Sequence, residues 1–162
     1  NEVNKLDYII DRAYDRKLVI ALNPSPYNEK IEACDLSKIS IFLLNEIEGA
    51  QITGLTEPND ILASMRKRFP EAKIVLTLGK DGARYSDKDC EYEQPIFPVK
   101  AVDTTAAGDT FTGYFLAGLI RGMEIPDILR MSAKASSIAV TRNGAVQSIP
   151  KREEVEAALS AD

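Results

Sequence analysis

The sequence contains no histidine and no tryptophan, and only two of its 162 residues are cysteine. Without histidine, the chain cannot build a Ser-His-Asp or Cys-His catalytic set, or a histidine-ligated metal site, from its own residues. Acid–base chemistry must therefore fall to carboxylates or lysines. Cys34 and Cys90 lie far apart without paired spacing, which indicates neither a disulfide framework nor a zinc site. Reduced cysteines favour a cytoplasmic location.

Long apolar runs are also missing, so the sequence predicts neither a membrane span nor a signal peptide. The formal net charge is −5, and basic residues are scattered among acidic ones. This distribution argues against binding to nucleic acid, because phosphate backbones attract clustered lysine and arginine. We therefore expect neither a membrane nor a nucleic acid as a partner.

Helical patterns alternate with short β-branched runs, which predicts one domain with an α/β fold and a mainly parallel sheet. Strands are expected at residues 18–22, which should be buried, 39–44 and 73–77, with a hairpin of residues 83–86 and 91–94. Helices are expected at residues 6–14, 45–52, 58–69, 109–121, 126–141 and 151–159, and Gly122 should end the helix before it. Ligands of such sheets bind beyond the carboxyl ends of the strands, so the loops that follow three strands should converge.

The segment from Ala101 to Gly113, AVDTTAAGDTFTG, combines a turn of small residues with a carboxylate at the start of a predicted helix. The N–H groups at a helix start lack partners within the helix and suit an anion. Asp109 beside them is interpreted as a base that takes a proton from an attacking hydroxyl. Alternatively, Asp109 is an ordinary acidic residue favoured by the helix dipole, and the local pattern does not separate the two.

Residues 103–113 resemble the signature of the ribokinase-like carbohydrate kinases, and residues 139–145 and 148–150 resemble the next stretch typical of that family. The resemblance covers nearly the whole chain but only the C-terminal half of a family member. It implies a three-layer α/β fold, mainly parallel with helices on both faces of the sheet. Residues 1–162 would then be the C-terminal nucleotide-binding and catalytic part, without the half that holds the lid and most sugar contacts.

The resemblance implies an ATP-dependent phosphotransferase. Asp109 matches the catalytic base, which contacts both substrate and nucleotide, and the backbone of Ala106, Ala107 and Gly108 matches the anion hole for the transferring phosphoryl group. Nucleotide binding would further involve a Thr-Leu-Gly-x-x-Gly loop, which this chain matches with Thr77, Leu78, Gly79, Lys80, Asp81 and Gly82. Alternatively, Gly79 and Gly82 only shape a turn between strands.

Two cation sites are implied by the same resemblance. Asn45 and Glu48 match an Asn-x-x-Glu motif in which the glutamate holds water around Mg²⁺, although their spacing equally suits a helix capping box. A monovalent cation, usually K⁺, would lie beside the anion hole, mostly on backbone carbonyls. The matching positions are Asp103, Thr105, Ala139, Arg142, Gly144 and Ser148. Alternatively, Asp103 caps a turn and Asn143-Gly144 forms a tight bend.

The substrate is the least defined element. Glu2 matches a ribose contact but would equally be a frayed terminal acid, and Asn23-Pro-Ser-Pro26 resembles a segment of the members that phosphorylate D-ribose. We therefore expect ATP and D-ribose as substrates and a homodimer for the full-length protein. The alternatives are fructose or 2-keto-3-deoxygluconate, with nucleosides further back, an inactive nucleotide-binding fragment, and a structural or regulatory module.

Overall fold

The computed structural model describes residues 4–161, so Glu2, the expected sugar contact, lies outside the described residues. The described chain divides into two compact units. The first contains the residues up to 79 together with 84–91, and the second contains 80–83 and the residues from 92 on. The expected single domain over residues 1–162 stays a prediction.

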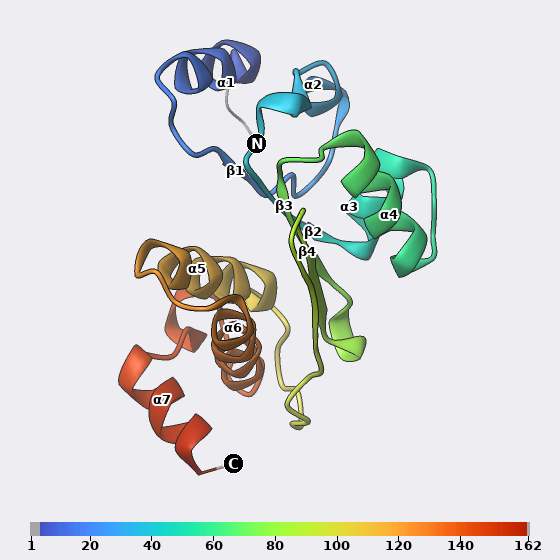
Figure 1. Cartoon of the computed structure of the whole chain (residues 1–162). Coiled ribbons are helices and arrows are strands. Elements are labelled where there is room, and N and C mark those ends of the chain that lie inside the picture. The colour runs from blue at the N-terminus through green and yellow to red at the C-terminus, as the bar shows by residue number, and fades with distance from the viewer. Residues whose placement is uncertain (1–3, 162) are drawn as a thin grey trace. The chain divides into compact units, whose positions relative to one another are not determined.

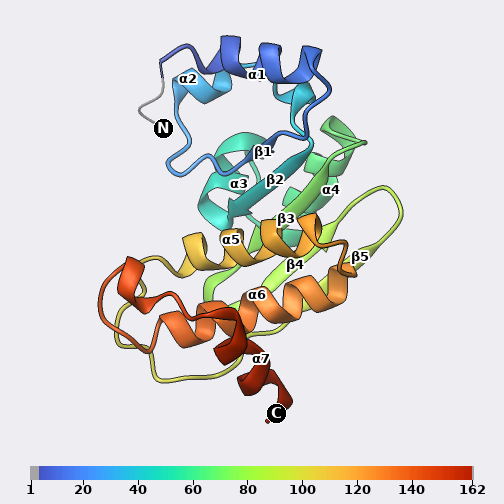
Figure 2. The same ribbon diagram turned by 90° about the vertical axis from the view of Figure 1, so that its left-hand side faces the viewer.

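Five strands form a sheet in the order β1-β2-β3-β4-β5; Figure 1 labels β1 to β4, and Figure 2 also labels β5. They are β1 (Ala21–Leu22), β2 (Ile41–Asn45), β3 (Lys73–Thr77), β4 (Ala83–Ser86) and β5 (Glu91–Gln94). β1 pairs with β2, and β2 with β3, in parallel. A tight turn joins β4 to β5, where the Asp87 N–H donates to the Cys90 carbonyl at 3.0 Å. The α/β class is confirmed, and β3, β4 and β5 begin and end at the predicted residues.

The central strands form because they are short apolar runs that are buried on both faces. Phe42 and Leu44 of β2 and Ile74 and Leu76 of β3 point into one core, where each is at most 2% exposed. Helices α3 (Glu46–Thr53) and α4 (Pro58–Arg68) cover this core. They approach closely at Gly49, where a Cβ atom would lie 2.8 Å from Cγ2 of Ile61.

The expected buried strand over residues 18–22 is wrong in both extent and burial. Only Ala21 and Leu22 form β1, and Leu18 and Val19 are 58% and 74% exposed. Lys17, at φ 58°, turns the chain after α1 (Leu6–Asp15), and the Leu18 N–H still bonds to the Ala13 carbonyl at 3.0 Å. The segment reaches the sheet only at Ile20, whose carbonyl accepts from the N–H groups of Ser40 and Ile41.

A short helix, α2 (Glu29–Glu32), was not predicted from the sequence. The side chain of Asn28 caps it by accepting hydrogen bonds from the N–H groups of Lys30 and Ile31 at 3.0 and 3.3 Å. Ile31 is its buried residue. One apolar residue in a single turn is too little for a period of 3.6 to be recognised.

The second unit is built on three helices, α5 (Ala107–Ile120), α6 (Ile125–Ala139) and α7 (Arg152–Ser160). α5 and α6 lie side by side (Figure 2). α5 begins two residues earlier than expected, because the turn is completed by Ala106 alone, at φ 62°. Gly122, at φ 68°, ends α5 as predicted, with its N–H on the Leu119 carbonyl.

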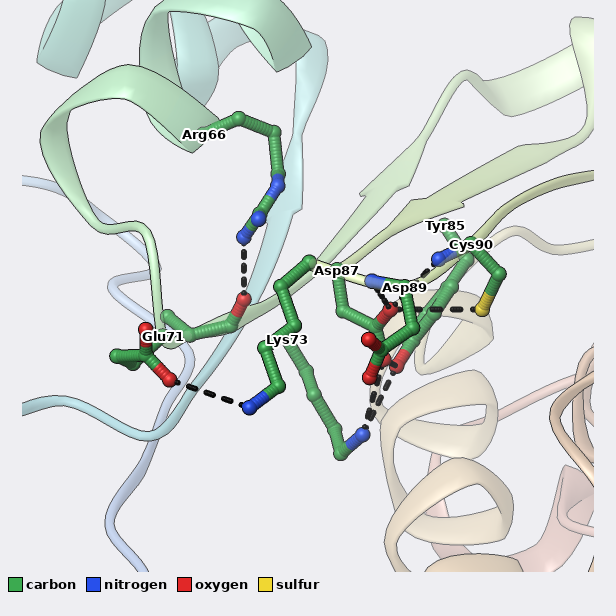
Figure 3. Close-up of polar contacts among 9 residues, drawn as sticks. Arg66, Glu71, Lys73, Tyr85, Asp87, Asp89 and Cys90 are labelled. Atoms are coloured by element: carbon green, nitrogen blue, oxygen red, sulfur yellow. Dashed lines mark hydrogen bonds and ion pairs between the residues drawn. The ribbon is translucent and has the colours of Figure 1, made fainter.

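A carboxylate with little solvent exposure fixes the β4–β5 hairpin to β3 (Figure 3). Asp87 Oδ2 accepts from Tyr85 Oη at 2.5 Å and from Lys73 Nζ at 3.1 Å, and Oδ1 accepts from the N–H groups of Asp89 and Cys90 at 2.9 and 3.0 Å. Burial opposes the charge, but the bonds from Tyr85, Asp89 and Lys73 outweigh it and lower the pKa of Asp87 far below its ordinary value. The carboxylate is therefore ionised at neutral pH.

Candidate functional site

The first two predicted loops meet at the carboxyl ends of two neighbouring strands. Asn45 ends β2 and Thr77 ends β3, and the two residues are partners in the parallel register. Thr77 Oγ1 also donates to the Leu44 carbonyl at 3.2 Å. The first unit thus brings Asn45, Glu48 and Thr77 to one edge of the sheet, where α/β proteins bind their ligands.

Asn45 and Glu48 form a reciprocal capping box at the start of α3. Asn45 Oδ1 accepts from the Glu48 N–H at 2.9 Å, and Glu48 Oε2 accepts from the Asn45 N–H at 3.0 Å. The capping alternative is therefore confirmed as a structural role for both residues. Glu48 is only 4% exposed, but its second oxygen, Oε1, makes no hydrogen bond within the described residues. One carboxylate oxygen suits a hydrated Mg²⁺, which prefers oxygen ligands and keeps several waters.

Asn45→Ala should lower the free energy of unfolding by about 1 kcal/mol, because α3 loses the acceptor for its first-turn N–H groups. Asn45→Asp should retain most of the stability, since a carboxylate can accept the same bond. Urea unfolding of the two variants beside the unsubstituted protein checks this. Equal losses for alanine and aspartate, or no loss for either, would show that the cap does not stabilise α3.

In the loop after β3, the turn-shaping alternative accounts for Gly82. Residues Gly79–Asp81 form a single 3₁₀ turn, and Gly82 has φ 92°. A Cβ atom at Gly82 would lie 2.2 Å from the Gln94 carbonyl oxygen, so only glycine fits against β5. Leu78 is buried, whereas Lys80 and Asp81 are exposed. The nucleotide-binding role of the loop stays a prediction.

The start of α5 presents Asp109 to solvent. Asp109 is the third residue of the helix, three positions after Ala106, which completes the turn. The Ala107 N–H donates to the Thr104 carbonyl at 3.2 Å. The space beside Gly108 is open, since a Cβ atom at this residue would meet nothing within 4 Å. First-turn N–H groups have no acceptor inside a helix, so this end of α5 offers donors beside an accessible carboxylate. Both interpretations of Asp109, base and first-turn acid, fit this position.

Asp103 joins two segments that are far apart in the sequence. Its Oδ1 accepts from the Thr105 N–H at 2.9 Å, and its Oδ2 accepts from the Gly144 N–H at 3.0 Å. A hydrogen bond from the Thr105 hydroxyl, followed by the bonds from the Gly144 and Thr105 N–H groups, lowers the pKa of Asp103 to about 2. The Val140 carbonyl also accepts from the N–H groups of Val102 and Asp103, at 2.7 and 3.2 Å.

The second unit therefore brings Asp103, Thr105 and Gly144 together, and the turn-capping alternative for Asp103 is confirmed as a structural role. The other expected cation positions follow along the same segment. Ala139 ends α6, and its carbonyl accepts a hydrogen bond from the Arg142 N–H at 3.0 Å. The hydroxyl of the buried Ser148 donates to the Ala145 carbonyl at 2.7 Å.

Among residues 4–161, no three or more carboxylates and cysteines gather as a metal cluster. The expected cation positions would offer one carboxylate, that of Asp103, together with mostly backbone carbonyls, and such a set suits a large monovalent ion better than a small divalent one. The Arg142 guanidinium forms an ion pair with Glu154 Oε1. The expected role of Arg142 in cation binding stays a prediction.

The sequence analysis did not predict three residues whose side chains connect distant segments of the second unit, nor the buried hydroxyl of Thr110. Ser136 Oγ donates to the Ala107 carbonyl 29 residues away, Tyr114 Oη donates to the Pro150 carbonyl 36 residues away, and Glu154 pairs with Arg142. The hydroxyl of Thr110 is buried without a hydrogen-bond partner in the described part of the chain. No local sequence pattern signals contacts of this range.

The family of the chain follows from a match that extends across both units. The model of the family described as "pfkB family carbohydrate kinase" matches residues 6–152, and the chain belongs to this family. It is 35% identical to the ribokinase of Bacillus subtilis over 156 residues, which is 96% of this chain and 51% of that protein. The chain thus spans about half the length of the curated relatives it matches.

Solved structures agree with this assignment. The ribokinase of Thermotoga maritima is 30% identical with a TM-score of 0.79, over 92% of this chain and 52% of that one. The Arabidopsis thaliana ribokinase complexed with ribose and ATP is 28% identical with a TM-score of 0.79, over 93% of this chain and 50% of that one. None of the helices in residues 4–161 combines the length and apolar character that crossing a membrane requires.

Proposed function

We propose that the chain is the nucleotide-binding and catalytic part of a kinase that transfers the γ-phosphoryl group of ATP to the primary hydroxyl of D-ribose, forming ribose 5-phosphate. The observation that supports this most is the exposed Asp109 carboxylate in the first turn of α5, beside N–H groups that can receive an anion. The choice of ribose rests on similarity to proteins named ribokinase, one of them complexed with ribose and ATP.

Asp109 serves as the general base in this proposal. As the sugar hydroxyl oxygen bonds to the γ-phosphorus and the bond to the leaving ADP oxygen breaks, the hydroxyl proton passes to the Asp109 carboxylate. The N–H groups of Gly108 and its neighbours stabilise the charge on the transferring group. Since phosphoryl transfer needs chiefly positioning and charge stabilisation, the start of α5 supplies two of its main requirements.

Mg²⁺ and K⁺ are the proposed cations. Glu48 would hold waters of Mg²⁺ through its Oε1 oxygen, and bound Mg²⁺ neutralises phosphate charge. Asp103, with the carbonyls of its neighbours and of residues 139–148, would hold K⁺. The Asp103 bond to Gly144 shows that these two segments already meet. Filling this place would stiffen the segment that precedes Asp109. We further propose that the full-length protein is a homodimer.

An assay of ADP release across a sugar panel tests the proposal. The full-length protein that contains this chain should turn over ATP with D-ribose in preference to fructose, 2-keto-3-deoxygluconate and nucleosides, since pocket hydrogen bonds discriminate among hydroxyl patterns. Calorimetry with Mg²⁺·ATP separates the remaining alternatives. Binding of ATP without turnover would favour the interpretation of the chain as an inactive nucleotide-binding fragment. Absence of binding would favour a structural module.

The full-length protein should be activated by K⁺ more strongly than by Na⁺, because a cage with one carboxylate and several carbonyls suits the larger ion. Initial rates measured in matched KCl and NaCl at constant ionic strength check this. Choline chloride at the same strength controls for screening. Equal rates in potassium and sodium would contradict the proposed cation site but would not bear on the assignment of Asp109.

A further inference from the structure

We propose that Glu154 and Tyr114 are positioning residues that hold the 140–150 segment in the conformation that completes the monovalent-cation site. The proposal rests on the cation site proposed above, but the contacts that carry it are independent of that assignment. Both residues lie outside the segment that they hold, Tyr114 on α5 and Glu154 on α7.

The 140–150 segment has few anchors of its own. It contains one 3₁₀ turn, Val146–Ser148, and most of its side chains are exposed. Besides the backbone bonds from Val102 and Asp103 to the Val140 carbonyl, three side-chain contacts reach it from other parts of residues 4–161. Asp103 Oδ2 accepts from the Gly144 N–H at 3.0 Å, Tyr114 Oη donates to the Pro150 carbonyl at 2.8 Å, and Glu154 Oε1 accepts from Arg142. The first contact belongs to the proposed cation site, while the other two hold the segment at both ends.

The two positioning residues are themselves fixed by packing. Val155, next to Glu154, is fully buried and packs with Met131 and Ala135 of α6. Tyr114 packs against this cluster, so α5, α6 and α7 share one apolar cluster. Burial, and then the negative charge of Glu154, raise the pKa of Tyr114. The Tyr114 hydroxyl therefore stays protonated at neutral pH and can donate to Pro150.

This arrangement gives the Arg142 side chain a function that a carbonyl ligand alone would not require. The guanidinium points to α7, and the ion pair orients the peptide whose carbonyl is expected to face the cation. The Arg142 and Glu154 side chains are 37% and 41% exposed, so the pair contributes modestly. We therefore expect graded effects on the segment and no loss of the fold.

The test compares Glu154→Gln with Glu156→Gln. Glu156 lies on the same helix, forms an ion pair with Arg152 at 2.5 Å, is similarly exposed at 45%, and is paired within α7. Glu154→Gln should speed hydrogen exchange of the Gly144 amide about two- to five-fold, and should raise the K⁺ concentration for half-maximal activation by a similar factor, with kcat at saturating K⁺ unchanged. Glu156→Gln should change neither quantity. The charge-swapped pair Arg142→Glu with Glu154→Arg should restore both.

Unchanged Gly144 exchange in Glu154→Gln would overturn the proposal, whatever the kinetics show. Faster exchange with an unchanged K⁺ response would overturn the link to the cation site. Faster exchange in a protein that does not respond to K⁺ at all would support the positioning contact and count against the cation site, so the two failures are distinguishable. Tyr114→Phe provides a second variant, in which loss of the hydroxyl should act in the same direction.

Discussion

Asp109→Asn is expected to lower the turnover of the full-length protein that contains this chain by about 10²–10⁴-fold, because the sugar hydroxyl loses its general base. ATP binding should persist, since the amide keeps the shape of the helix start and removes no donor to phosphate. Steady-state rates give the loss of turnover, and calorimetry gives the affinity for Mg²⁺·ATP.

A matched control is available on the neighbouring helix. Asp127 is exposed and is the third residue of α6, as Asp109 is the third residue of α5, so both carboxylates meet a helix dipole in the same way. Asp127→Asn should leave kcat unchanged while costing the same small stability. If both variants lost activity equally, or if Asp109→Asn kept near-normal kcat, Asp109 would be only a first-turn acid.

Asp87→Ala should lower the free energy of unfolding by about 2–3 kcal/mol, which is a large effect for a residue at a hairpin turn. The buried Tyr85 hydroxyl and the N–H groups of Asp89 and Cys90 all lose this acceptor, and Lys73 loses its partner (Figure 3). The Asp87 side chain is only 11% exposed, so water does not readily replace it. Urea unfolding at neutral pH measures the change.

Asp89→Ala is the control for that variant, because Asp89 lies in the same turn, is exposed, and contributes only its backbone N–H to the cluster. It should cost far less. The effect of Asp87 also depends on pH. Its pKa is lowered in the folded state, so its contribution is complete above the ordinary aspartate pKa of about 4 and declines as the pH falls below it. Similar stability losses at neutral pH for both variants would contradict the role of Asp87.

The sequence predicted most clearly those elements whose signals are local. β3 is a continuous apolar run between polar residues, and the capping box of α3 is legible from Asn45 and Glu48 alone. The role of Glu48 is nevertheless ambiguous from the sequence, because the same spacing from Asn45 fits both a helix capping box and a metal-binding motif. The structure confirms the cap, and the binding of Mg²⁺ by Glu48 is a proposal.

The failures have a common origin in tertiary context. Leu18 and Val19 form an apolar run like that of β3, yet they are exposed. A strand needs a neighbouring strand to pair with, and this segment first bonds to its neighbour at Ile20. Ala106 takes a left-handed conformation that costs an alanine about 1–2 kcal/mol and that propensity alone would not predict. Glu154 and Tyr114 gain their roles only when α7 packs beside α6.

Formation of ribose 5-phosphate is the most direct measure of the central claim. The full-length protein that contains this chain, given Mg²⁺·ATP, K⁺ and D-ribose, should release one ADP for each ribose 5-phosphate detected by phosphorus NMR, and Asp109→Asn should release almost none. ADP release without a sugar phosphate, or equal product from Asp109→Asn and the unsubstituted protein, would contradict it.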